Sequence, residues 1–352
     1  LPILLIKVDK KEELSHIAIS NVLEKYQFSE KRDRAFFTRL VEGTLERQIT
    51  IDYVADQFSK TKIRKCKPLI RALLRMGIYQ LLYMDQVPDS AACNEAVKLA
   101  KKRGFSRLSG FVNGVLRNIS RKKETISYPK KDKNLVTYLS VTYSIPEWII
   151  KFFMKTYDDE TVEKIIESYL EDKKTTLCCL MSKGGKDVIR KELEEENVTV
   201  EDGELIENSV KISDYDFLYR LRAFREGKCY VQDESSMLCA KLAGAKEGQF
   251  VMDLCSAPGG KSLYTADQMK GSGQVLSRDL TEYKTDLIED NIERMGFTNM
   301  EAEVFDATIL DEEHIEAADV VIADVPCSGL GIMGKKNDIK YHISDRKSTR
   351  LN

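Results

Sequence analysis

The sequence predicts a multidomain protein: an all-α helical bundle, then a small α+β module, then an α/β Rossmann-like domain with an incomplete sheet. Three observations predict this order. Apolar residues recur at helical spacing through residues 12–123, strands alternate with helices from Lys228 onward, and a mixed pattern lies between them. The predicted boundaries are 1–135, 136–225 and 226–344.

The helical bundle carries the positive charge of the chain. Residues 1–135 hold 28 Lys and Arg against 15 Asp and Glu, a balance of +13, whereas the remainder has a balance of −15. This asymmetry favours a polyanionic partner for the bundle, with solvated helix faces as the alternative. Little aromatic interleaving accompanies the basic residues, so base stacking is not indicated. The basic clusters are Lys60–Lys67, Lys101–Arg103, Arg121–Lys123 and Lys130–Lys131.

Composition excludes several other classes. Hydrophobic residues make up 42% and charged residues 32%, which is a globular balance. No apolar run is long enough to span a bilayer, so no membrane partner is expected. The eight cysteines lack metal-ligand spacing and only three histidines are present, so we expect no metal site. Reduced thiols are typical of a cytoplasmic protein.

The middle module is predicted from short alternating elements. Thr175–Leu180 and Val198–Val200 have the composition of strands, and Asp187–Glu195 has that of a helix. We expect the segment from Phe217 to Phe224 to close this module.

The α/β domain is predicted from four apolar strands that alternate with helices, the pattern of a parallel, doubly wound sheet. The expected strands are Phe250–Leu254, Gln274–Ser277, Met300–Phe305 and Asp319–Asp324, with helices at Lys261–Met269 and Glu282–Met295.

A glycine-containing loop follows the first of these strands. It runs from Asp253 to Lys261, and Gly259 and Gly260 allow a ligand to approach the backbone closely. The spacing matches neither a Walker A loop nor G-x-G-x-x-G. In such folds ligands bind beyond the carboxyl ends of the strands. The loop is therefore a candidate ligand site, with a plain glycine turn as the alternative.

Polar side chains stand at the ends of successive strands. Asp253, Asp279 and Asp306 end or follow the first three strands. A carboxylate after the second strand can bind the ribose hydroxyls of a nucleoside cofactor, and Asp306 lies where an adenine edge would lie. An isolated aspartate after a strand is more often a cap or turn residue.

The fourth strand ends in Asp324, and the turn after it presents Cys327. A thiol there can act as a base or nucleophile if its surroundings are electropositive. The alternative is a small buried cysteine.

Two motifs together carry a family resemblance. DLCSAPGGK at residues 253–261 and DVPCSG at residues 324–329 resemble the paired signature of the RNA cytosine-C5 methyltransferases, and VQDESS at residues 231–236 resembles the segment before their cofactor loop. Several stretches of the helical part resemble the NusB-like RNA-binding domain. The combination is similar to the RsmB (Sun/Fmu) group of bacterial 16S rRNA methyltransferases, over nearly the whole chain. The NusB-like stretches are residues 33–37, 71–82, 94–97 and 111–117.

The resemblance implies S-adenosyl-L-methionine as cofactor, a class I methyltransferase domain, small-subunit ribosomal RNA as partner, and a cytoplasmic monomer. Asp279 would bind the ribose and Asp306 the adenine side, while Asp324 would contact the cofactor and the target cytosine. Cys327 would assist loss of the C5 proton. The cofactor loop would comprise Cys255, Ser256, Ala257, Pro258, Gly259, Gly260 and Lys261.

The sequence departs from the family pattern near its end. In the family a second cysteine adds to C6 of cytosine, but no cysteine follows Cys327. Residues 345–352 match a translated sequencing adapter, so we interpret the native sequence as ending near Ser344, with a natural basic tail as the alternative. We therefore expect this chain to bind cofactor weakly and to transfer no methyl group. Two other functions stay open: a non-catalytic NusB-like RNA-binding protein and a tRNA cytosine-C5 methyltransferase.

Overall fold

The computed structural model describes residues 1–171 and 174–343. The chain forms two compact units, one of Leu1–Lys173 with Cys327–Asn352 and the other of Lys174–Pro326. The interpretation of residues 345–352 as adapter sequence falls outside the described residues. No helix of the described residues is long and apolar enough to cross a bilayer.

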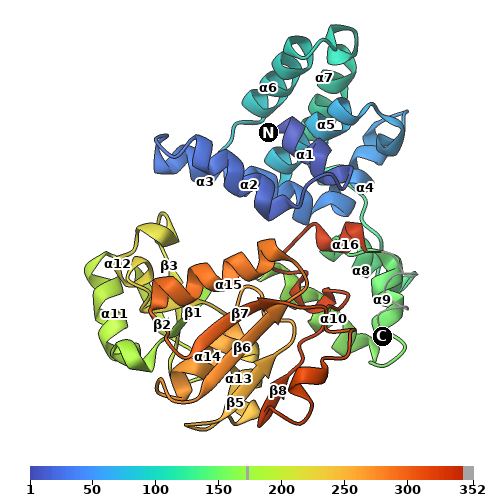
Figure 1. Cartoon of the computed structure of the whole chain (residues 1–352). Helices are drawn as coiled ribbons and strands as arrows, with labels where there is room; N and C mark the ends of the chain where they lie inside the picture. Colours follow the sequence, from blue (N-terminus) through green and yellow to red (C-terminus); the bar gives the residue numbers. More distant parts are fainter. Residues whose placement is uncertain (172–173, 344–352) are drawn as a thin grey trace. The chain divides into compact units, whose positions relative to one another are not determined.

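The first unit begins with a bundle of seven α-helices (Figure 1). Helix α5 lies at its centre, because nearly every side of this helix is apolar and buried, including Leu73, Ile78 and Tyr79. The predicted bundle is confirmed. Its helices are α1 (Pro2–Asp9), α2 (Ser15–Lys25), α3 (Lys31–Glu46), α4 (Gln48–Phe58), α5 (Pro68–Tyr83), α6 (Asp89–Lys102) and α7 (Ser106–Arg121).

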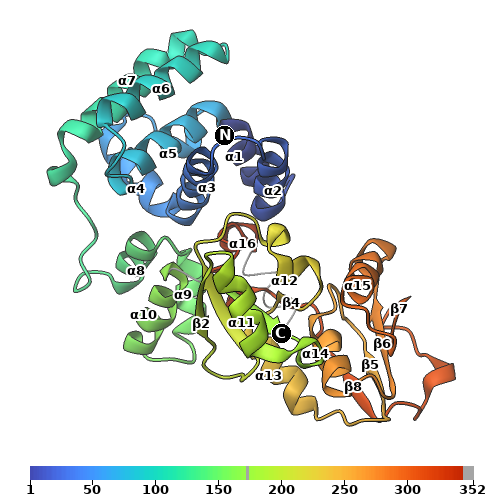
Figure 2. The ribbon, with the colours of Figure 1, turned by 90° about the vertical axis from the view of Figure 1, so that its left-hand side faces the viewer.

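Three further helices and a distant segment complete this unit. Helices α8 (Leu135–Tyr143), α9 (Glu147–Phe153) and α10 (Asp159–Glu167) share one apolar core with Leu330 and Met333. The segment that carries these two residues ends in α16 (Ile339–His342), which the views in Figures 1 and 2 place beside the helices of this unit.

The second unit contains an antiparallel sheet with the order β2-β3-β1-β4. Helix α11 (Gly185–Glu195) packs on one face, where Leu177 and Cys179 are buried, while Cys178 and Leu180 are buried in a second core. The end of β1 is therefore buried on both faces, which explains the apolar run from Leu177 to Leu180. The strands are β1 (Thr175–Cys179), β2 (Thr199–Asp202), β3 (Ser209–Ser213) and β4 (Cys229–Val231).

The segment expected to close this module forms no strand, but Leu221 and Ala223 are buried in the core of the module. Residues 217–224 contain only a short 3₁₀ turn, Leu218–Arg220, and part of α12 (Arg222–Arg225). Strand β4 completes the sheet instead by pairing with β1, so that Cys179 lies opposite Cys229.

The other sheet is parallel, with the order β7-β6-β5-β8, and confirms the predicted α/β fold. Helices α13 (Glu234–Ala243), α14 (Gly260–Gln268) and α15 (Glu282–Met295) contribute to one apolar core with its strands. Because all strands run the same way, their carboxyl ends lie at one edge. The strands are β5 (Phe250–Asp253), β6 (Gln274–Asp279), β7 (Met300–Val304) and β8 (Val320–Ile322).

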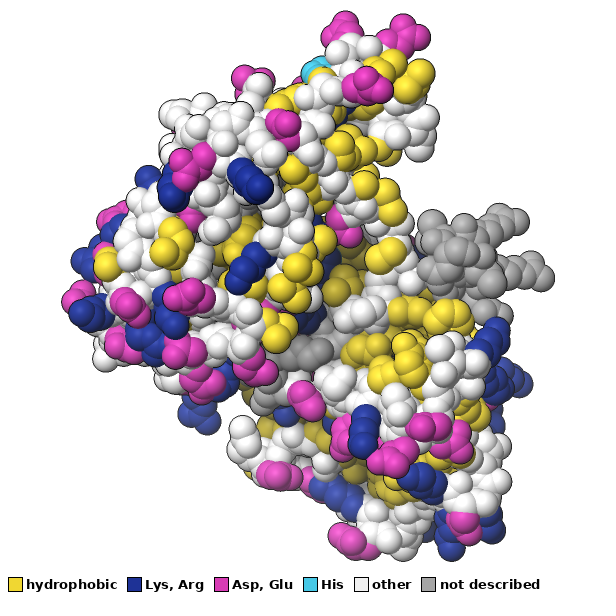
Figure 3. All heavy atoms as spheres, turned by 90° about the horizontal axis from the view of Figure 1, so that it is seen from below, with side chains coloured by type: hydrophobic (Ala, Val, Ile, Leu, Met, Phe, Trp, Pro, Cys, Tyr) yellow, Lys and Arg dark blue, Asp and Glu magenta, His cyan; other side chains and the backbone are white. Residues whose placement is uncertain are grey.

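Charged side chains of both signs are interspersed on the face of the molecule that Figure 3 shows. On this face the mixed charges give no broad field of one sign.

Candidate functional site

The glycine-containing loop connects β5 to α14 at the carboxyl edge of the parallel sheet. Gly259 caps α14 with φ +100°, a left-handed conformation that a side chain would strain. A Cβ atom on Gly259 would also lie 3.4 Å from Ile288 Cγ2. The local sequence thus allows a tight turn into the helix and brings backbone N–H groups to the edge of the sheet.

Asp253 ends β5, and its carboxylate binds the loop that follows. Its side chain is fully buried, Ser262 Oγ donates to its Oδ2 (2.8 Å), and Ser256 Oγ lies 2.8 Å from Ser262 Oγ. Burial raises the pKa of Asp253, although the Ser262 hydroxyl opposes this rise. The role of this carboxylate in the structure is to fix the loop onto α14.

Asp279 ends β6 and contacts the same loop. Its Oδ2 accepts the Ala257 N–H (3.0 Å), and its Oδ1 accepts the Leu280 N–H (2.8 Å) and Lys284 Nζ (2.7 Å). Burial acts to raise the pKa of Asp279, but Lys284 and the two N–H groups outweigh it and lower that pKa. A carboxylate offers about four acceptor positions, so one on Oδ2 remains for a ligand hydroxyl.

Asp324 follows β8 and pairs with Lys261 in the first turn of α14. The Lys261 side chain is largely buried, whereas that of Asp324 is 59% exposed. This ion pair joins the last strand of the sheet to the loop, and its carboxylate is open to a ligand. Asp253, Asp279, Asp324 and the loop therefore form one connected group.

Asp306 stands apart from this group. It lies two residues beyond β7, and its Oδ1 accepts both the N–H (2.9 Å) and the hydroxyl (2.7 Å) of Thr308. These bonds lower the pKa of Asp306 and form a local turn. Its second carboxylate oxygen points to no partner among the described residues.

The two candidate cysteines differ in their surroundings. Cys255 is half-buried, and burial together with Asp279 and Asp253 raises the pKa of its thiol. Cys327 is exposed and begins the segment that belongs to the helical unit. The structure gives Cys255 no thiolate character, so it suits a packing role in the loop.

Gln232 was not predicted as a site residue. Its side chain is buried, with 8% of the residue exposed, and neither its amide nitrogen nor its amide oxygen has a hydrogen-bond partner in the described part of the chain. A Cβ atom on Gly260 would lie 3.2 Å from its Nε2, so the amide adjoins the loop. Unpaired buried amides are costly, which marks this one as a candidate ligand contact. The sequence did offer one signal for this site, because Gln232 is a polar residue between strand β4 and helix α13.

Two family models match the chain. The NusB family matches residues 4–121, and the 16S rRNA methyltransferase RsmB/F family matches residues 240–351. The two matches fall on the helical bundle and on the part that contains the parallel sheet.

Curated relatives match along almost the full chain. The probable ribosomal RNA small subunit methyltransferase B of Bacillus subtilis is 37% identical over 350 residues, which cover 99% of this chain and 77% of that protein. The protein of the same name from Synechocystis is 29% identical and aligns with 95% of this chain and 75% of its own length.

Solved structures share the fold. The crystal structure of PH0851 has a TM-score of 0.80 at 24% identity and covers 99% of this chain and 78% of that one. A methyltransferase homolog from Pyrococcus horikoshii has a TM-score of 0.50 at 19% identity and covers 57% of this chain and 66% of that one.

Proposed function

The chain belongs to the ribosomal RNA small subunit methyltransferase B family, and from this premise we propose that it methylates C5 of cytosine in 16S ribosomal RNA. The methyl donor in this proposal is S-adenosyl-L-methionine. The observation that carries it is the connected group at the sheet edge, where an ionised carboxylate and an unpaired buried amide adjoin the same glycine-containing loop.

The group at the sheet edge fits this cofactor. The free acceptor position on Asp279 suits a ribose hydroxyl, and the Gln232 amide can pair with a polar group of the methionine part. The N–H groups of Gly260 and Lys261, in the first turn of α14, would meet the carboxylate end. Those of Cys255, Ser256, Ala257 and Gly259 are already donated within the protein. Asp306, with one carboxylate oxygen unused, would meet the adenine side.

The cofactor, when bound, supplies an electrophilic methyl group. Cytosine C5 is a poor nucleophile until a thiolate adds at C6, and that thiolate would have to leave again after methyl transfer. No residue of the given sequence is assigned to this addition, and the residues at the sheet edge would orient the base. Asp324 is exposed and held at the edge by Lys261. It would accept a hydrogen bond from the cytosine amino group or, when protonated, donate one to N3. Cys327 would assist removal of the C5 proton after transfer.

The remaining assignments follow from the same proposal. Residues 1–135 would bind ribosomal RNA, and residues 226–344 would carry out methyl transfer. Residues 136–225 would link these two domains. The protein would act as a monomer in the cytoplasm without a metal ion.

Cofactor binding tests the site directly. We expect titration calorimetry to detect S-adenosyl-L-methionine binding by the 352-residue chain, and Asp279→Asn to weaken it about tenfold, the loss of one charge-assisted hydrogen bond. The matched control is Asp290→Asn, an exposed aspartate on α15. Equal affinity of the two variants would remove Asp279 from the site.

Methyl transfer tests the reaction. The part of the Bacillus subtilis relative beyond the aligned 77% can be joined to residues 1–343, and the hybrid assayed with labelled cofactor beside that relative itself. We expect label at C5 of cytosine in 16S rRNA and its loss in the Asp324→Asn hybrid. Label in tRNA alone would favour a tRNA enzyme, and cofactor binding without label in any RNA would favour a non-catalytic RNA-binding protein.

A further inference from the structure

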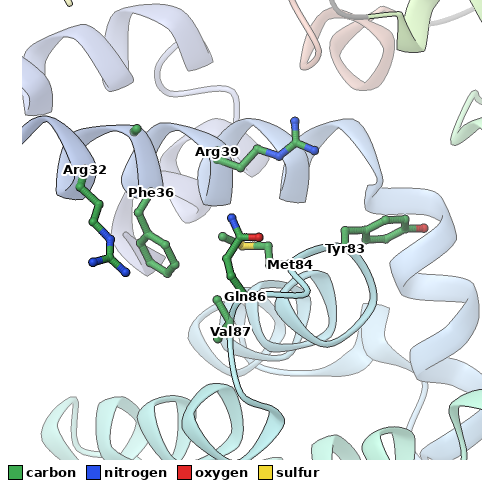
Figure 4. A pocket seen from close by; sticks show the side chains of 8 residues that line it. Arg32, Phe36, Arg39, Tyr83, Met84, Gln86 and Val87 are labelled. Carbon is green, nitrogen blue, oxygen red and sulfur yellow. The ribbon is translucent and has the colours of Figure 1, made fainter.

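A pocket of about 820 Å³ opens in the helical unit, away from the sheet edge (Figure 4). Its walls come from α3 and from the end of α5 with the residues that follow it. The volume lies in the range of pockets that hold small organic groups. The side chains that matter for its chemistry are Arg32, Phe36, Arg39, Tyr83, Gln86 and Val87.

Three of these residues share one side of α3. Arg32, Phe36 and Arg39 are spaced by four and three residues, so they form a stripe along the helix. Figure 4 shows the side chains of Arg32 and Phe36 extending from α3 toward the side where Gln86 and Val87 lie. Arg39 also lines the cavity, but in Figure 4 its side chain runs along α3 away from Phe36.

The two guanidinium groups are not held in salt bridges, although Arg39 lies near enough to Glu42 to oppose the rise that burial causes in the pKa of that carboxyl. Neither Arg32 nor Arg39 forms an ion pair within the described part of the helical unit, and both side chains are exposed. By contrast, Arg71 and Arg75 of the same bundle pair with carboxylates. Seven residues of helix separate the backbone positions of the two pocket arginines by about 10 Å along the axis of α3. The spacing suits two phosphates on either side of one nucleotide.

The aromatic rings of the pocket are not equivalent. Tyr83 stacks on Tyr79 at 5.3 Å between ring centroids, and the Arg47 guanidinium lies 5.3 Å from the Tyr83 ring. Phe36 is 39% exposed and has no such ring contact among the described residues. Phe36 is therefore the ring that can receive a base, and the Gln86 amide beside it can pair with a base edge.

We propose that this pocket binds one unpaired nucleotide of the RNA substrate, with its base on Phe36 and its flanking phosphates on Arg32 and Arg39. The proposal rests on the proposed function for the identity of the polyanion as RNA. Charge complementarity supports it, because residues 1–135 carry an excess of 13 positive charges. An apolar protein partner fits worse, since it would bury two unpaired guanidinium groups. The sequence did not indicate base stacking, but the exposed ring of Phe36 offers a surface on which a base can stack.

Fluorescence anisotropy with the full chain tests the pocket, using a labelled 12-nucleotide single-stranded RNA of mixed sequence. We expect Phe36→Ala to weaken binding about tenfold, the loss of one stacked base, and Phe36→Trp to retain it. Arg32→Gln and Arg39→Gln should each weaken binding and lower the slope of log K against log salt by about 0.7, as for one lost phosphate contact. Phe36→Ala should leave that slope unchanged.

The control is Arg107→Gln, an exposed arginine of α7 outside the pocket. Circular dichroism melting of each variant separates a binding defect from unfolding. If the pocket variants bind RNA as the Arg107→Gln control does, the pocket proposal is overturned while the methyltransferase proposal stands. If the unaltered chain binds the cofactor but no RNA, both proposals fail.

Discussion

The helical unit and the α/β unit each bury an arginine between two carboxylates, but the α/β unit also uses several buried carboxylates to hold its loops. In the helical unit Arg75 is 10% exposed, with its Nη1 2.9 Å from Asp9 Oδ1 and its Nη2 2.7 Å from Asp52 Oδ2. In the α/β unit Arg278 lies between Glu303 and Asp311. The charge of Arg75 is thus compensated by side-chain carboxylates, and no backbone group of a loop contributes.

In the α/β unit a buried carboxylate accepts hydrogen bonds from a loop instead. Glu234 Oε1 accepts the N–H groups of Leu205 (2.8 Å) and Ile206 (3.0 Å) and the hydroxyl of Ser209 (2.8 Å). Asp267 binds the N–H groups of Met181 and Ser182 in the same way.

The difference follows from the elements themselves. A helix satisfies its own backbone donors except in its first turn, so carboxylates beside the middle of a helix, such as Asp9 and Asp52 beside α5, meet side-chain donors. Loops between strands and helices leave N–H groups unpaired, and a nearby carboxylate can fix them. The candidate cofactor loop is held in this way by Asp279 and Asp253, so it needs little ordering when a ligand binds.

The strongest test of the contrast is Arg75→Leu. This change leaves Asp9 and Asp52 partly buried without their shared cation, and we expect it to lower the free energy of unfolding by about 3–5 kcal/mol. Urea unfolding followed by circular dichroism measures the loss.

Two further variants check the reason for that loss. Arg71→Leu should cost less, because Asp9 keeps Arg75. Adding Asp9→Asn and Asp52→Asn to Arg75→Leu should restore part of the stability, since no uncompensated charge is then left. A triple variant as unstable as Arg75→Leu alone would show that packing, and not charge, dominates.

The second test concerns how the stability that Glu234 contributes depends on pH. Burial acts to raise the pKa of Glu234, but the loop hydrogen bonds outweigh it and lower the pKa to about 2. A lowered folded-state pKa stabilises the protein above the unfolded value near 4.5, and this contribution is lost as the pH falls toward 2. The shift corresponds to roughly 3 kcal/mol at neutral pH.

We therefore expect Glu234→Gln to lower the free energy of unfolding by about 2–3 kcal/mol at pH 7, because the amide accepts the loop N–H groups more weakly. The difference from the unaltered protein should shrink between pH 5 and pH 3. Glu289→Gln, at an exposed position of α15, serves as the control with little effect at any pH. A difference that stays constant with pH would contradict the charge-based explanation.

The predictable part of the molecule is the part that local sequence dictates. The strand–loop–helix from Phe250 to Gln268 was predicted within a residue, because an apolar strand, two glycines and an amphipathic helix occur in one continuous stretch. Strand β3 and the pairing of β4 with β1 were missed, since Ser209–Ser213 and Cys229–Val231 are short and depend on partners far along the chain.

Side-chain surroundings were less predictable than the backbone. The sequence placed Asp279 and Asp324 at strand ends, but it could not tell that Asp279 binds the loop backbone or that Asp324 pairs with Lys261. It also gave no sign that Gln232 lacks a partner or that Arg32 and Arg39 share a pocket with Phe36, because those facts depend on tertiary packing.

Asp338 is a carboxylate of the helical unit that accepts a backbone N–H group, as the carboxylates of the α/β unit do. Its side chain is fully buried and accepts the Ser15 N–H (3.0 Å) at the start of α2, and also the Ser15 hydroxyl. Three neighbours anchor the same segment: Lys340 Nζ and the Tyr341 hydroxyl donate to the Glu46 and Leu45 carbonyls, and His342 Nε2 lies 3.0 Å from the Val8 carbonyl.

We expect Asp338→Asn to lower the free energy of unfolding by only about 1–2 kcal/mol, because one acceptor oxygen survives and the neighbouring anchors remain. The larger effect should be local, with trypsin cleaving after Lys335 and Lys336 several times faster as the segment opens from α2. Asp85→Asn, an exposed change in the same unit, should leave the cleavage rate unchanged. If Asp338→Asn instead destabilises as much as Arg75→Leu, this carboxylate acts as part of the core of the helical unit, and the distinction between charge-pairing and loop-holding carboxylates fails there.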